Sequence, residues 1–325
     1  KIVGSKNFYF VLCFQTAFSI IESNKQPPAT VRQPDRKGMT MKGILIFIAA
    51  AVLLLFLLLL CSTLERRWLV IRKQNLHLSQ LPQAFNGLRL VQLSDLHKQV
   101  YPHGERKLLQ AVQACQPDVI VITGDLVSRT VTDFSERQEL LMHLRQIAPV
   151  YLCLGNHEWD MQPQQIADYR AMIAAAGCEL LENQTISFHR GAGTCYLAGA
   201  SLRIGIYHNA DFQYQNLETY SSEDLTHDIG SRKGCTILLA HSPFPAENYF
   251  AWGADLTLSG HVHGGIVRIP GIGGLLSPER KLFPKYSKGL YTKDGKYLYV
   301  NCGIGKLRLG NPPEVTMLEL HSKWN

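Results

Sequence analysis

The sequence lacks the features that define several common protein classes. No C-x-x-C pair occurs among its eight cysteines, which are scattered along 325 residues. This spacing argues against a structural zinc cage and against a small disulfide-bonded scaffold. Long runs of Lys and Arg are also missing, and 33 basic against 26 acidic residues give a net charge of only +7. We therefore expect no specific nucleic-acid partner.

Internal repeats and low-complexity linkers are likewise absent, and the sequence has no second domain boundary. With 46% hydrophobic residues, the chain cannot be wholly disordered or collagen-like, and a coiled coil is also excluded. Cys153 and Cys235 lie in the apolar runs VYLCL and CTILL. We interpret such cysteines as small buried hydrophobic residues in a reduced compartment.

One long apolar run is present, residues 43–61 (GILIFIAAAVLLLFLLLLC). It is long enough to cross a hydrocarbon core of about 30 Å. The apolar region of a cleaved signal peptide is shorter, about 7 to 15 residues, and ends at small residues. We therefore predict one uncleaved transmembrane helix.

This helix divides the chain into three regions. We assign residues 1–38 to an N-terminal extension, because Met39 and Met41 stand immediately before the span. Residues 39–73 form the membrane anchor and its flank, and residues 74–325 form one globular domain. Basic residues flank both ends of the span, but a start at Met39 or Met41 would favour a cytoplasmic globular domain by the positive-inside rule. The oligomeric state stays open.

The globular region alternates short apolar runs with stretches of helical periodicity. Helical spacing occurs over 108–115, 140–147 and 164–177, with Gly177 placed to end the last helix. A βαβαβ start and a strand-rich second half predict an α/β or mixed sandwich with buried sheets. The predicted strands are 88–93, 119–123, 150–154, 195–200, 236–240, 256–259, 297–301 and 315–320.

Polar residues of the types that bind metals follow five of these predicted strands. The segments are QLSDLH with Asp95 and His97, VITGDL with Asp125, LCLGNHE with Asn156 and His157, ILLAHSP with His241, and LSGHVHGG with His261 and His263. Open α/β sheets place their sites at the carboxyl ends of strands. We therefore expect these side chains to converge.

Seven of these residues supply oxygen or imidazole donors, which suits two divalent cations that share a carboxylate. They are Asp95, His97, Asp125, Asn156, His241, His261 and His263. In D-x-H and H-x-H, residues two apart in extended backbone would point the same way. Gly264 and neighbouring glycines would allow the backbone to approach a metal or a phosphate closely.

The ordered series D-x-H, G-D, G-N-H-E, a single His and G-H-x-H resembles the signature of the calcineurin-like metallophosphoesterases, over residues 88–320. The resemblance implies a four-layer αββα sandwich of two mixed β-sheets flanked by helices, with a dinuclear site at the strand ends. Carried onto this sequence, one metal would be bound by Asp95, His97, Asp125 and His263. The other would be bound by Asp125, Asn156, His241 and His261.

The mechanism implied by the resemblance is hydrolysis of phosphate mono- or diesters by a metal-activated water. His157 would be the catalytic residue, contacting the phosphate together with Asn156 and protonating the leaving oxygen. The donor set suits Mn, Fe or Zn without choosing among them. Two positions depart from the family pattern: Gln99 stands where many members carry Gly, and Ser128 stands where many carry Asp. The sequence therefore does not identify the group that orients His157.

A membrane anchor joined to this domain is similar to a bacterial, membrane-attached branch of the family. Some relatives act on phosphate-containing lipids such as UDP-diacylglucosamine. The loop 266–284 is rich in Gly and Pro and sets Leu275 and Leu276 near Arg280 and Lys281. It would admit an acyl chain and a phosphate, with Arg280 as a binding residue. The alternatives are a non-catalytic binding scaffold and a nuclease-type phosphodiesterase.

Overall fold

The computed structural model describes residues 41–65, 67–98, 105–269, 271–305 and 308–323. The extension assigned to residues 1–38 lies outside this part of the chain, as does Gln99. The first described element is helix α2, Met41–Glu65, none of whose residues is buried. Among the described residues it is the one helix long and apolar enough to cross a membrane. The predicted helix over the apolar run is confirmed.

The first sheet of the globular region has six strands. All neighbouring pairs are parallel except β14 and β2, which are antiparallel. The strand that comes first in the sequence, at 70–78, pairs with the strand that comes last, at 314–322. The two ends of the globular region thus meet in one sheet. The strand order is β1 (Val70–Leu78), β14 (Glu314–Ser322), β2 (Leu88–Leu93), β3 (Val119–Thr123), β4 (Val150–Cys153) and β5 (Glu179–Leu180).

The second sheet also has six strands and is also mixed. Its three inner pairs are parallel, and each edge strand is antiparallel to its neighbour. The order is β12 (Gly289–Lys293), β13 (Lys296–Val300), β9 (Leu256–Ser259), β8 (Cys235–Ala240), β7 (Gly193–Ala200) and β6 (Gln184–Arg190). A separate short ribbon joins β10 (Arg268–Ile269) to β11 (Gly273–Gly274).

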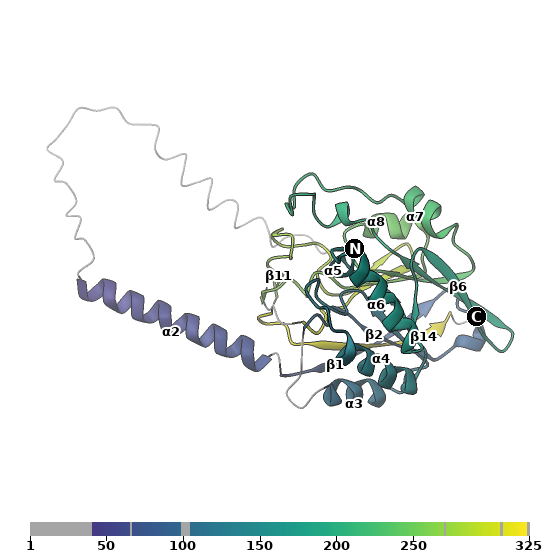
Figure 1. The fold of residues 1–325 in the computed structure, drawn as a ribbon, viewed down its shortest axis with the longest axis horizontal. Helices are drawn as coiled ribbons and strands as arrows, with labels where there is room; N and C mark the ends of the chain where they lie inside the picture. Colours follow the sequence, from purple (N-terminus) through teal and green to yellow (C-terminus); the bar gives the residue numbers. More distant parts are fainter. Residues whose placement is uncertain (1–40, 66, 99–104, 270, 306–307, 324–325) are drawn as a thin grey trace, which may run out of the picture. The chain divides into compact units, whose positions relative to one another are not determined.

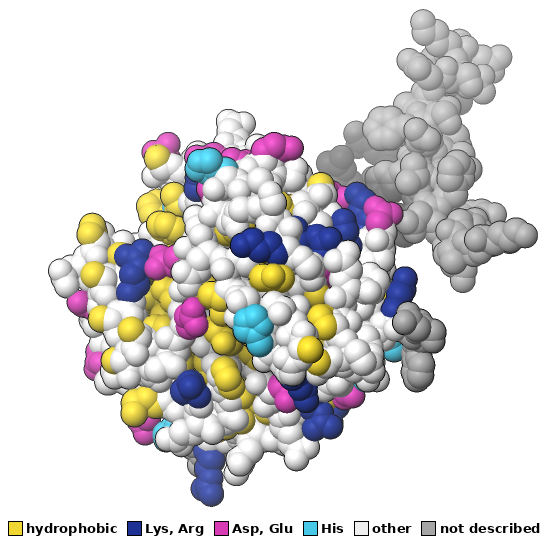
Figure 2. Space-filling view, turned by 90° about the vertical axis from the view of Figure 1, so that its right-hand side faces the viewer, with side chains coloured by type: hydrophobic (Ala, Val, Ile, Leu, Met, Phe, Trp, Pro, Cys, Tyr) yellow, Lys and Arg dark blue, Asp and Glu magenta, His cyan; other side chains and the backbone are white. Residues whose placement is uncertain are grey.

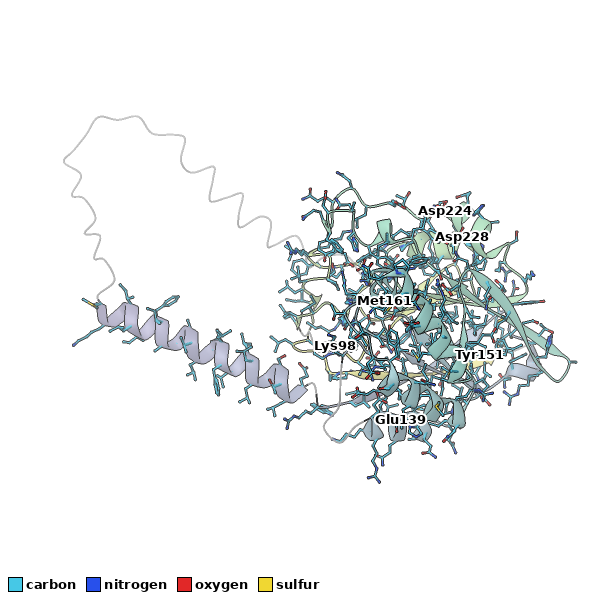
Figure 3. The ribbon with its side chains drawn as sticks, viewed as in Figure 1. Lys98, Glu139, Tyr151, Met161, Asp224 and Asp228 are labelled. Carbon is cyan, nitrogen blue, oxygen red and sulfur yellow. The ribbon has the colours of Figure 1, made fainter. Side chains whose placement is uncertain are left out.

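Helices cover the outer face of each sheet. Figure 1 shows α3 (Arg106–Ala114) and α4 (Ser135–Ile147) on one side of the sheets, and α7 (Ser222–Ile229) and α8 (Ala246–Trp252) on the other. In Figure 3, Glu139 of α4 lies at the lower edge of the domain, whereas Asp224 and Asp228 of α7 lie at the upper edge. The remaining helical elements are η1 (Gln83–Phe85), α5 (Asn156–Trp159), α6 (Pro163–Ala175) and η2 (Ile204–Ile206).

The alternation of side chains along the strands separates the layers. In β3, Val121 packs between the two sheets, whereas Ile122 packs against the helices outside the first sheet. In β8, Leu239 packs between the sheets and Leu238 packs against the α7 and α8 side. Successive residues of a strand point to opposite faces, so both faces of these strands are buried. The predicted four-layer αββα sandwich is confirmed.

The surface on the β6 side of the domain carries mixed charge. Figure 2 shows Lys and Arg side chains interspersed with Asp and Glu side chains over this face. The described residues on this face form no continuous basic stripe. A polyanion would therefore find no extended binding track there.

Candidate metal centre

The candidate ligands follow the carboxyl ends of strands from both sheets. In the first sheet, β2, β3 and β4 run parallel and lead into the segments that carry the two Asp residues and Asn156. In the second sheet, β8 and β9 run parallel and lead into two segments that together carry three histidines. A backbone hydrogen bond joins the segments that follow the two sheets here. Ile304, after β13, donates its N–H to the carbonyl of Ser94, after β2, over 3.1 Å. The predicted convergence of strand ends is thus present.

Five of the seven candidate ligands adopt left-handed backbone. Their φ angles lie between 51° and 68°, a region that residues with a side chain rarely occupy and that clusters at functional sites. The prediction that D-x-H and H-x-H segments are extended is therefore wrong. The chain turns sharply after each strand because backbone bonds between loops hold it there, such as Asp95 N–H to the Gly124 carbonyl at 3.1 Å. The five residues are Asp95, His97, Asp125, His261 and His263.

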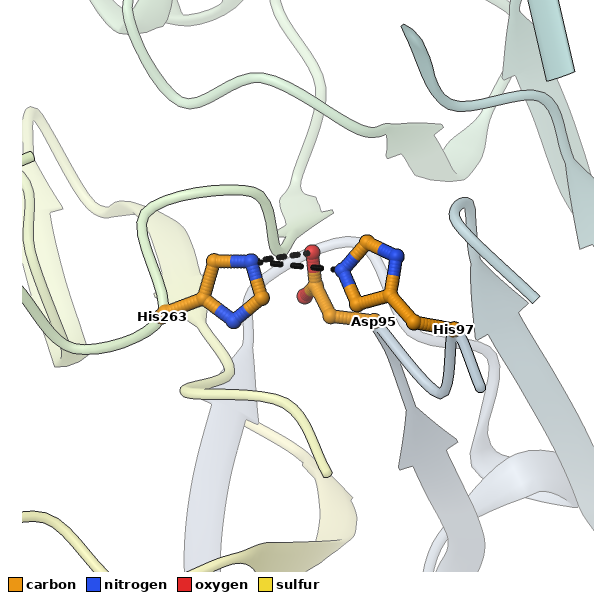
Figure 4. A group of neighbouring side chains, drawn as sticks. All are labelled: Asp95, His97 and His263. Carbon is orange, nitrogen blue, oxygen red and sulfur yellow. Dashed lines mark hydrogen bonds and ion pairs between the residues drawn. The ribbon is translucent and has the colours of Figure 1, made fainter. Parts of the chain in front are cut away.

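Asp95, His97 and His263 form the first group of possible ligands. Each offers one ligand atom, and these atoms lie within 4.8 Å of one another. The Nε2 atoms of the two histidines are 3.3 Å apart, and His263 Nε2 is 3.7 Å from Asp95 Oδ1 (Figure 4). Two imidazole nitrogens and a carboxylate oxygen facing one point make a donor set for a divalent cation.

Asp125 belongs to two further groups of the same kind. One joins it to His241 and His261, and the other joins it to His97 and His157. His241 Nε2 lies 3.3 Å from Asp125 Oδ2. A carboxylate shared between neighbouring groups is suited to bridge two cations.

Two buried ligand atoms in the centre have no hydrogen-bond partner among the described residues, Asn156 Oδ1 and His241 Nε2. Leaving buried polar atoms unpaired costs about 1–3 kcal/mol each. The Nδ1–H of His241 donates to the Thr123 carbonyl over 2.6 Å, which fixes the ring and leaves Nε2 as the ligand atom. These residues therefore fit a bound metal ion.

Charge in the centre is carried by two buried carboxylates. Burial raises the pKa of Asp95, and the nearby charge of Asp125 adds to the rise. Burial also opposes ionisation of Asp125, but its imidazole neighbours, His241 foremost, hold its pKa well below the ordinary value. Burial would lower the pKa of His241, yet the Asp125 charge raises it to about 10. A divalent cation would take the place of that proton.

Burial disfavours the charged form of three further imidazoles in the centre. Burial lowers the pKa of His97 to about 4, and it also lowers the pKa values of His157 and His263 below the ordinary value. A neutral imidazole keeps a lone pair that a metal can use. The centre therefore combines carboxylate oxygens with imidazole nitrogen donors.

The backbone orients His157. The N–H of Arg129 donates to His157 Nδ1 over 3.2 Å, so the ring proton resides on Nε2. Arg129 is held in turn by Asp160, whose Oδ2 lies 2.6 Å from the guanidinium. Many family members carry Asp at the position of Ser128. In this chain the backbone N–H of the next residue, Arg129, orients the His157 ring.

The two remaining predicted substrate residues are Gly264, which directly follows His263, and Arg280. Gly264 adopts a φ of +72°, and a side chain there would collide with Asn311. Its carbonyl accepts from Arg268 Nη1 over 3.2 Å. Arg280 is exposed, and its guanidinium lies 5.8 Å from the centre of the Tyr214 ring.

A pocket of about 410 Å³ opens beside the first group. Histidines of the centre line it together with a lysine, a serine, a tyrosine and two aliphatic side chains. Lys98 follows β2 at the left edge of the domain in Figure 3. The lining residues are His97, Lys98, Ser128, His157, Tyr214, His263, Ile266 and Pro278.

Sequence reasoning missed a buried carboxylate that supports the centre, Glu158. Its side chain accepts the backbone N–H groups of Gly155 over 2.8 Å and of Asp125 over 3.0 Å. Burial raises its pKa to about 8, and the Asp125 charge contributes to the rise. Its position in G-N-H-E was the available signal, because Glu in the first turn of a helix often bonds the backbone before it.

A second missed support is Arg308, which is buried. Its guanidinium donates to three backbone carbonyls, those of Gly305 over 2.6 Å, Asn311 over 3.1 Å and Cys302 over 3.3 Å. The segment that it holds packs against the first group, because a Cβ on Gly305 would lie 2.8 Å from the His97 ring. No local motif marks this role.

Comparison with known proteins assigns the family. The profile of the calcineurin-like phosphoesterases matches residues 88–265, which is more than half of the chain. The chain belongs to this family. The matched segment contains all seven candidate metal ligands and His157, so the family resemblance drawn from the motifs is confirmed, and with it the assignment as a hydrolase of phosphoester bonds.

Several relatives carry more specific names. The chain is 29% identical over 270 residues to the metallophosphoesterase YkuE of Bacillus subtilis, covering 80% of this chain and 88% of that protein. It is 25% identical to the UDP-2,3-diacylglucosamine pyrophosphatase LpxG of Chlamydia trachomatis, covering 78% and 90%. It is 27% identical to the phosphodiesterase YaeI of Escherichia coli, covering 63% and 71%. Each of these alignments covers more than 60% of this chain.

Proposed function

We propose that this protein is a membrane-anchored hydrolase that cleaves phosphate esters with two divalent cations. The observation that carries the proposal is the pair of buried ligand atoms without partners among the described residues, Asn156 Oδ1 and His241 Nε2, beside the shared carboxylate of Asp125. Mn, Fe and Zn all suit the donors. One cation would be held by Asp95, His97, Asp125 and His263, and the other by Asp125, Asn156, His241 and His261.

Two cations held in this way supply positive charge that lowers the pKa of a water and neutralises phosphate oxygens. The chain's own groups orient the substrate. His157 keeps its proton on Nε2 because its Nδ1 accepts the Arg129 N–H, so Nε2 donates a hydrogen bond to the phosphate or the leaving oxygen. Lys98 adds a positive charge at the wall of the pocket.

We propose an amphipathic phosphate ester, such as a lipid-linked one, as the substrate class. Tyr214, Ile266 and Pro278 give apolar surface to the pocket that the histidines also line. The following loop exposes further apolar side chains, with Leu282 66% and Phe283 57% accessible to solvent. Apolar surface beside a phosphate-binding centre suits a substrate with an acyl chain. The relative named as a UDP-2,3-diacylglucosamine pyrophosphatase makes that lipid the first candidate.

The membrane placement follows from helix α2. We propose a single-pass protein in which the globular domain begins at Val70, the first residue of β1, and faces the cytoplasm. Only a few residues separate the end of α2 at Glu65 from Val70. Such a short connection keeps the domain at the membrane surface, where a lipid substrate resides.

The reaction is tested with the full chain in detergent micelles. After metal removal, we expect no turnover of chromogenic phosphate mono- or diesters, and we expect Mn²⁺, Fe²⁺ or Zn²⁺ to restore it. A folded chain that binds two ions but hydrolyses neither class nor the lipid would support the non-catalytic scaffold instead. Polynucleotide hydrolysis that weakens steeply with salt would support the nuclease.

The substrate class is tested by replacing Leu282 with Ser. Full burial of one such side chain contributes about 1.5–3 kcal/mol, so we expect the KM for UDP-diacylglucosamine in mixed micelles to rise about tenfold. The soluble chromogenic ester should be hydrolysed as by the unaltered chain. Met142→Ser, at an exposed position of α4, is the control. Equal effects on both substrates would contradict the lipid assignment.

A further inference from the structure

A buried carboxylate contacts one of the candidate ligands from outside the matched family segment. Glu279 is 3% exposed, and its Oε1 contacts Nε2 of His261. It lies beyond residue 265, where the family match ends. Burying a carboxylate without compensation is unfavourable by several kcal/mol. The contact with His261 places a partner for the buried carboxylate directly at a candidate metal ligand.

A tight turn holds Glu279 in place. The Ser277 N–H donates to the Lys281 carbonyl and the Arg280 N–H donates to the Ser277 carbonyl, each over 2.9 Å. Leu276 and Leu282 pair across the base of the turn in an antiparallel bridge. Backbone bonds on both sides of Glu279 thus fix the direction of its side chain.

The same turn packs against the pocket and against His261. Pro278 lines the pocket. Lys281 Nζ lies 4.8 Å from the centre of the Phe244 ring, and that ring contacts the His261 ring edge to face at 5.9 Å. Glu279 therefore lies at the junction between the pocket wall and the ligand.

Glu279 lies behind His261 rather than among the ligands. The group formed by Asp125, His241 and His261 does not include it, and no other ligand group among the described residues does. Within the described part of the chain, its one ion pair is with His261. A carboxylate that accepts the second N–H of a metal-binding histidine fixes the ring and makes its other nitrogen a stronger donor.

We propose that Glu279 is a positioning residue that holds His261 for the second cation. It accepts the Nε2–H of His261, so Nδ1 is the nitrogen left for the metal. The bound cation and the carboxylate polarise the same imidazole from opposite sides, and this compensates the burial of the carboxylate. The inference rests on the proposed function, because it requires a cation at His261.

The test measures metal binding by the full chain in detergent micelles, with Mn²⁺ as the probe. Loss of a carboxylate that supports a metal ligand lowers affinity by about 10–100-fold. We expect Glu279→Gln to weaken one of two Mn²⁺ binding steps by that factor in calorimetric titration. The exchange-coupled signal of a Mn²⁺ pair in electron paramagnetic resonance should fall at limiting metal, and the signal of a single ion should replace it. Glu279→Asp should restore part of the affinity.

The control for the substitution is Glu247→Gln. Glu247 is an exposed carboxylate on α8, paired with Lys285 and Lys293 at 2.7 Å each. This variant should bind both ions as the unaltered chain does. In a His261→Ala background, Glu279→Gln should cause no further loss, because Glu279 acts through His261.

Three results would overturn the inference. Unchanged binding of both ions by Glu279→Gln would show that the carboxylate does not position His261. Equal weakening of both steps, with a lower Tm of the metal-free protein, would show a general structural role. If the unaltered chain bound fewer than two ions, the proposed function itself would fail, and this outcome is visible before any variant is made.

Discussion

The two β-sheets contribute different chemistry to the candidate centre. The first sheet presents both carboxylates, Asp95 and Asp125, together with the amide of Asn156. The second sheet presents only imidazoles, those of His241, His261 and His263. Carboxylate oxygens are therefore concentrated on one side, and the imidazole nitrogens that complete each ligand group come largely from the other.

Neither half is complete without the other, and specific bonds between the sheets hold them in register. The His261 N–H donates to the Asp95 carboxylate over 3.0 Å, and His241 Nδ1–H donates to the Thr123 carbonyl. Gln92 Nε2 donates to the Ser259 carbonyl over 2.9 Å within the buried space between the sheets. The packing of the sandwich thus determines the spacing of the ligands.

The largest expected effect comes from the shared carboxylate of the first sheet. Asp125→Asn should abolish binding of both cations, whereas His241→Asn in the second sheet should abolish binding of one. Each cation contributes several kcal/mol to the transition state, so at about 1.4 kcal/mol per factor of ten the Asp125 variant should lose at least about 10⁴-fold in turnover. Metal content after dialysis, measured by mass spectrometry, distinguishes two ions from one and from none.

The control for this pair is Asp294→Asn, the same chemical change at an exposed turn residue with a φ of 50°. It should keep both ions and full turnover. Loss of a single ion from Asp125→Asn would mean that this carboxylate is not shared, and the contrast between the two sheets would then be wrong.

A smaller effect is expected from His157, which lies on the first-sheet side but is not needed as a ligand. His157→Ala should keep both ions and lose about 100-fold in kcat, the lower end of what a positioned proton donor contributes. Because Nε2 carries the proton, His157→Gln should retain more activity than the Ala variant. His189→Ala, at an exposed position of β6, is the control.

Measurement of kcat together with bound metal separates the two roles of His157. If the Ala variant loses an ion, His157 is a ligand in its own right, as its group with His97 and Asp125 also allows. If Gln restores no activity, hydrogen-bond donation from this position is not what the reaction uses.

Much of the fold could be predicted from apolar runs alone. The strands at 88–93, 119–123 and 256–259 have the predicted bounds, because nearly all of their residues are buried and most of them are apolar. Strand β1 was not predicted, since VIRKQNLHL exposes Arg72 and Lys73. It is an edge strand whose partner, β14, lies at the other end of the sequence. Such pairing depends on the tertiary fold.

The candidate centre also combines features that local sequence predicts with features that depend on the tertiary fold. Residue types and their order after the strands predicted which side chains come together. Their backbone conformation was not predictable, because the left-handed φ of Asp95 depends on a bond to the Gly124 loop. The orientation of His157 depends on a backbone N–H, and the contact of Glu279 depends on a turn 18 residues away from His261. Neither leaves a local pattern.

The smallest of these effects tests the contact between the sheets directly. Gly303 follows β13 in the second sheet, and a Cβ there would lie 2.6 Å from the Cβ of Asp95 in the first. Overpacking of a closely packed site destabilises by about 1–3 kcal/mol. Gly303→Ala should therefore lower the free energy of unfolding by that amount and weaken the cation of the Asp95 group. Denaturant titration of the metal-free protein and Mn²⁺ titration measure the two effects.

Gly289→Ala separates the contact from backbone strain. Gly289 has a φ of 87°, close to the 71° of Gly303, but nothing lies within 4 Å of its added Cβ. Both variants lose left-handed freedom, so the difference between them isolates the collision with Asp95. If the two variants lose equal stability and both keep full metal affinity, the spacing of the sheets at Asp95 does not limit the centre. If only Gly303→Ala loses affinity, the packing between the sheets sets the position of the carboxylate on which the first ligand group depends.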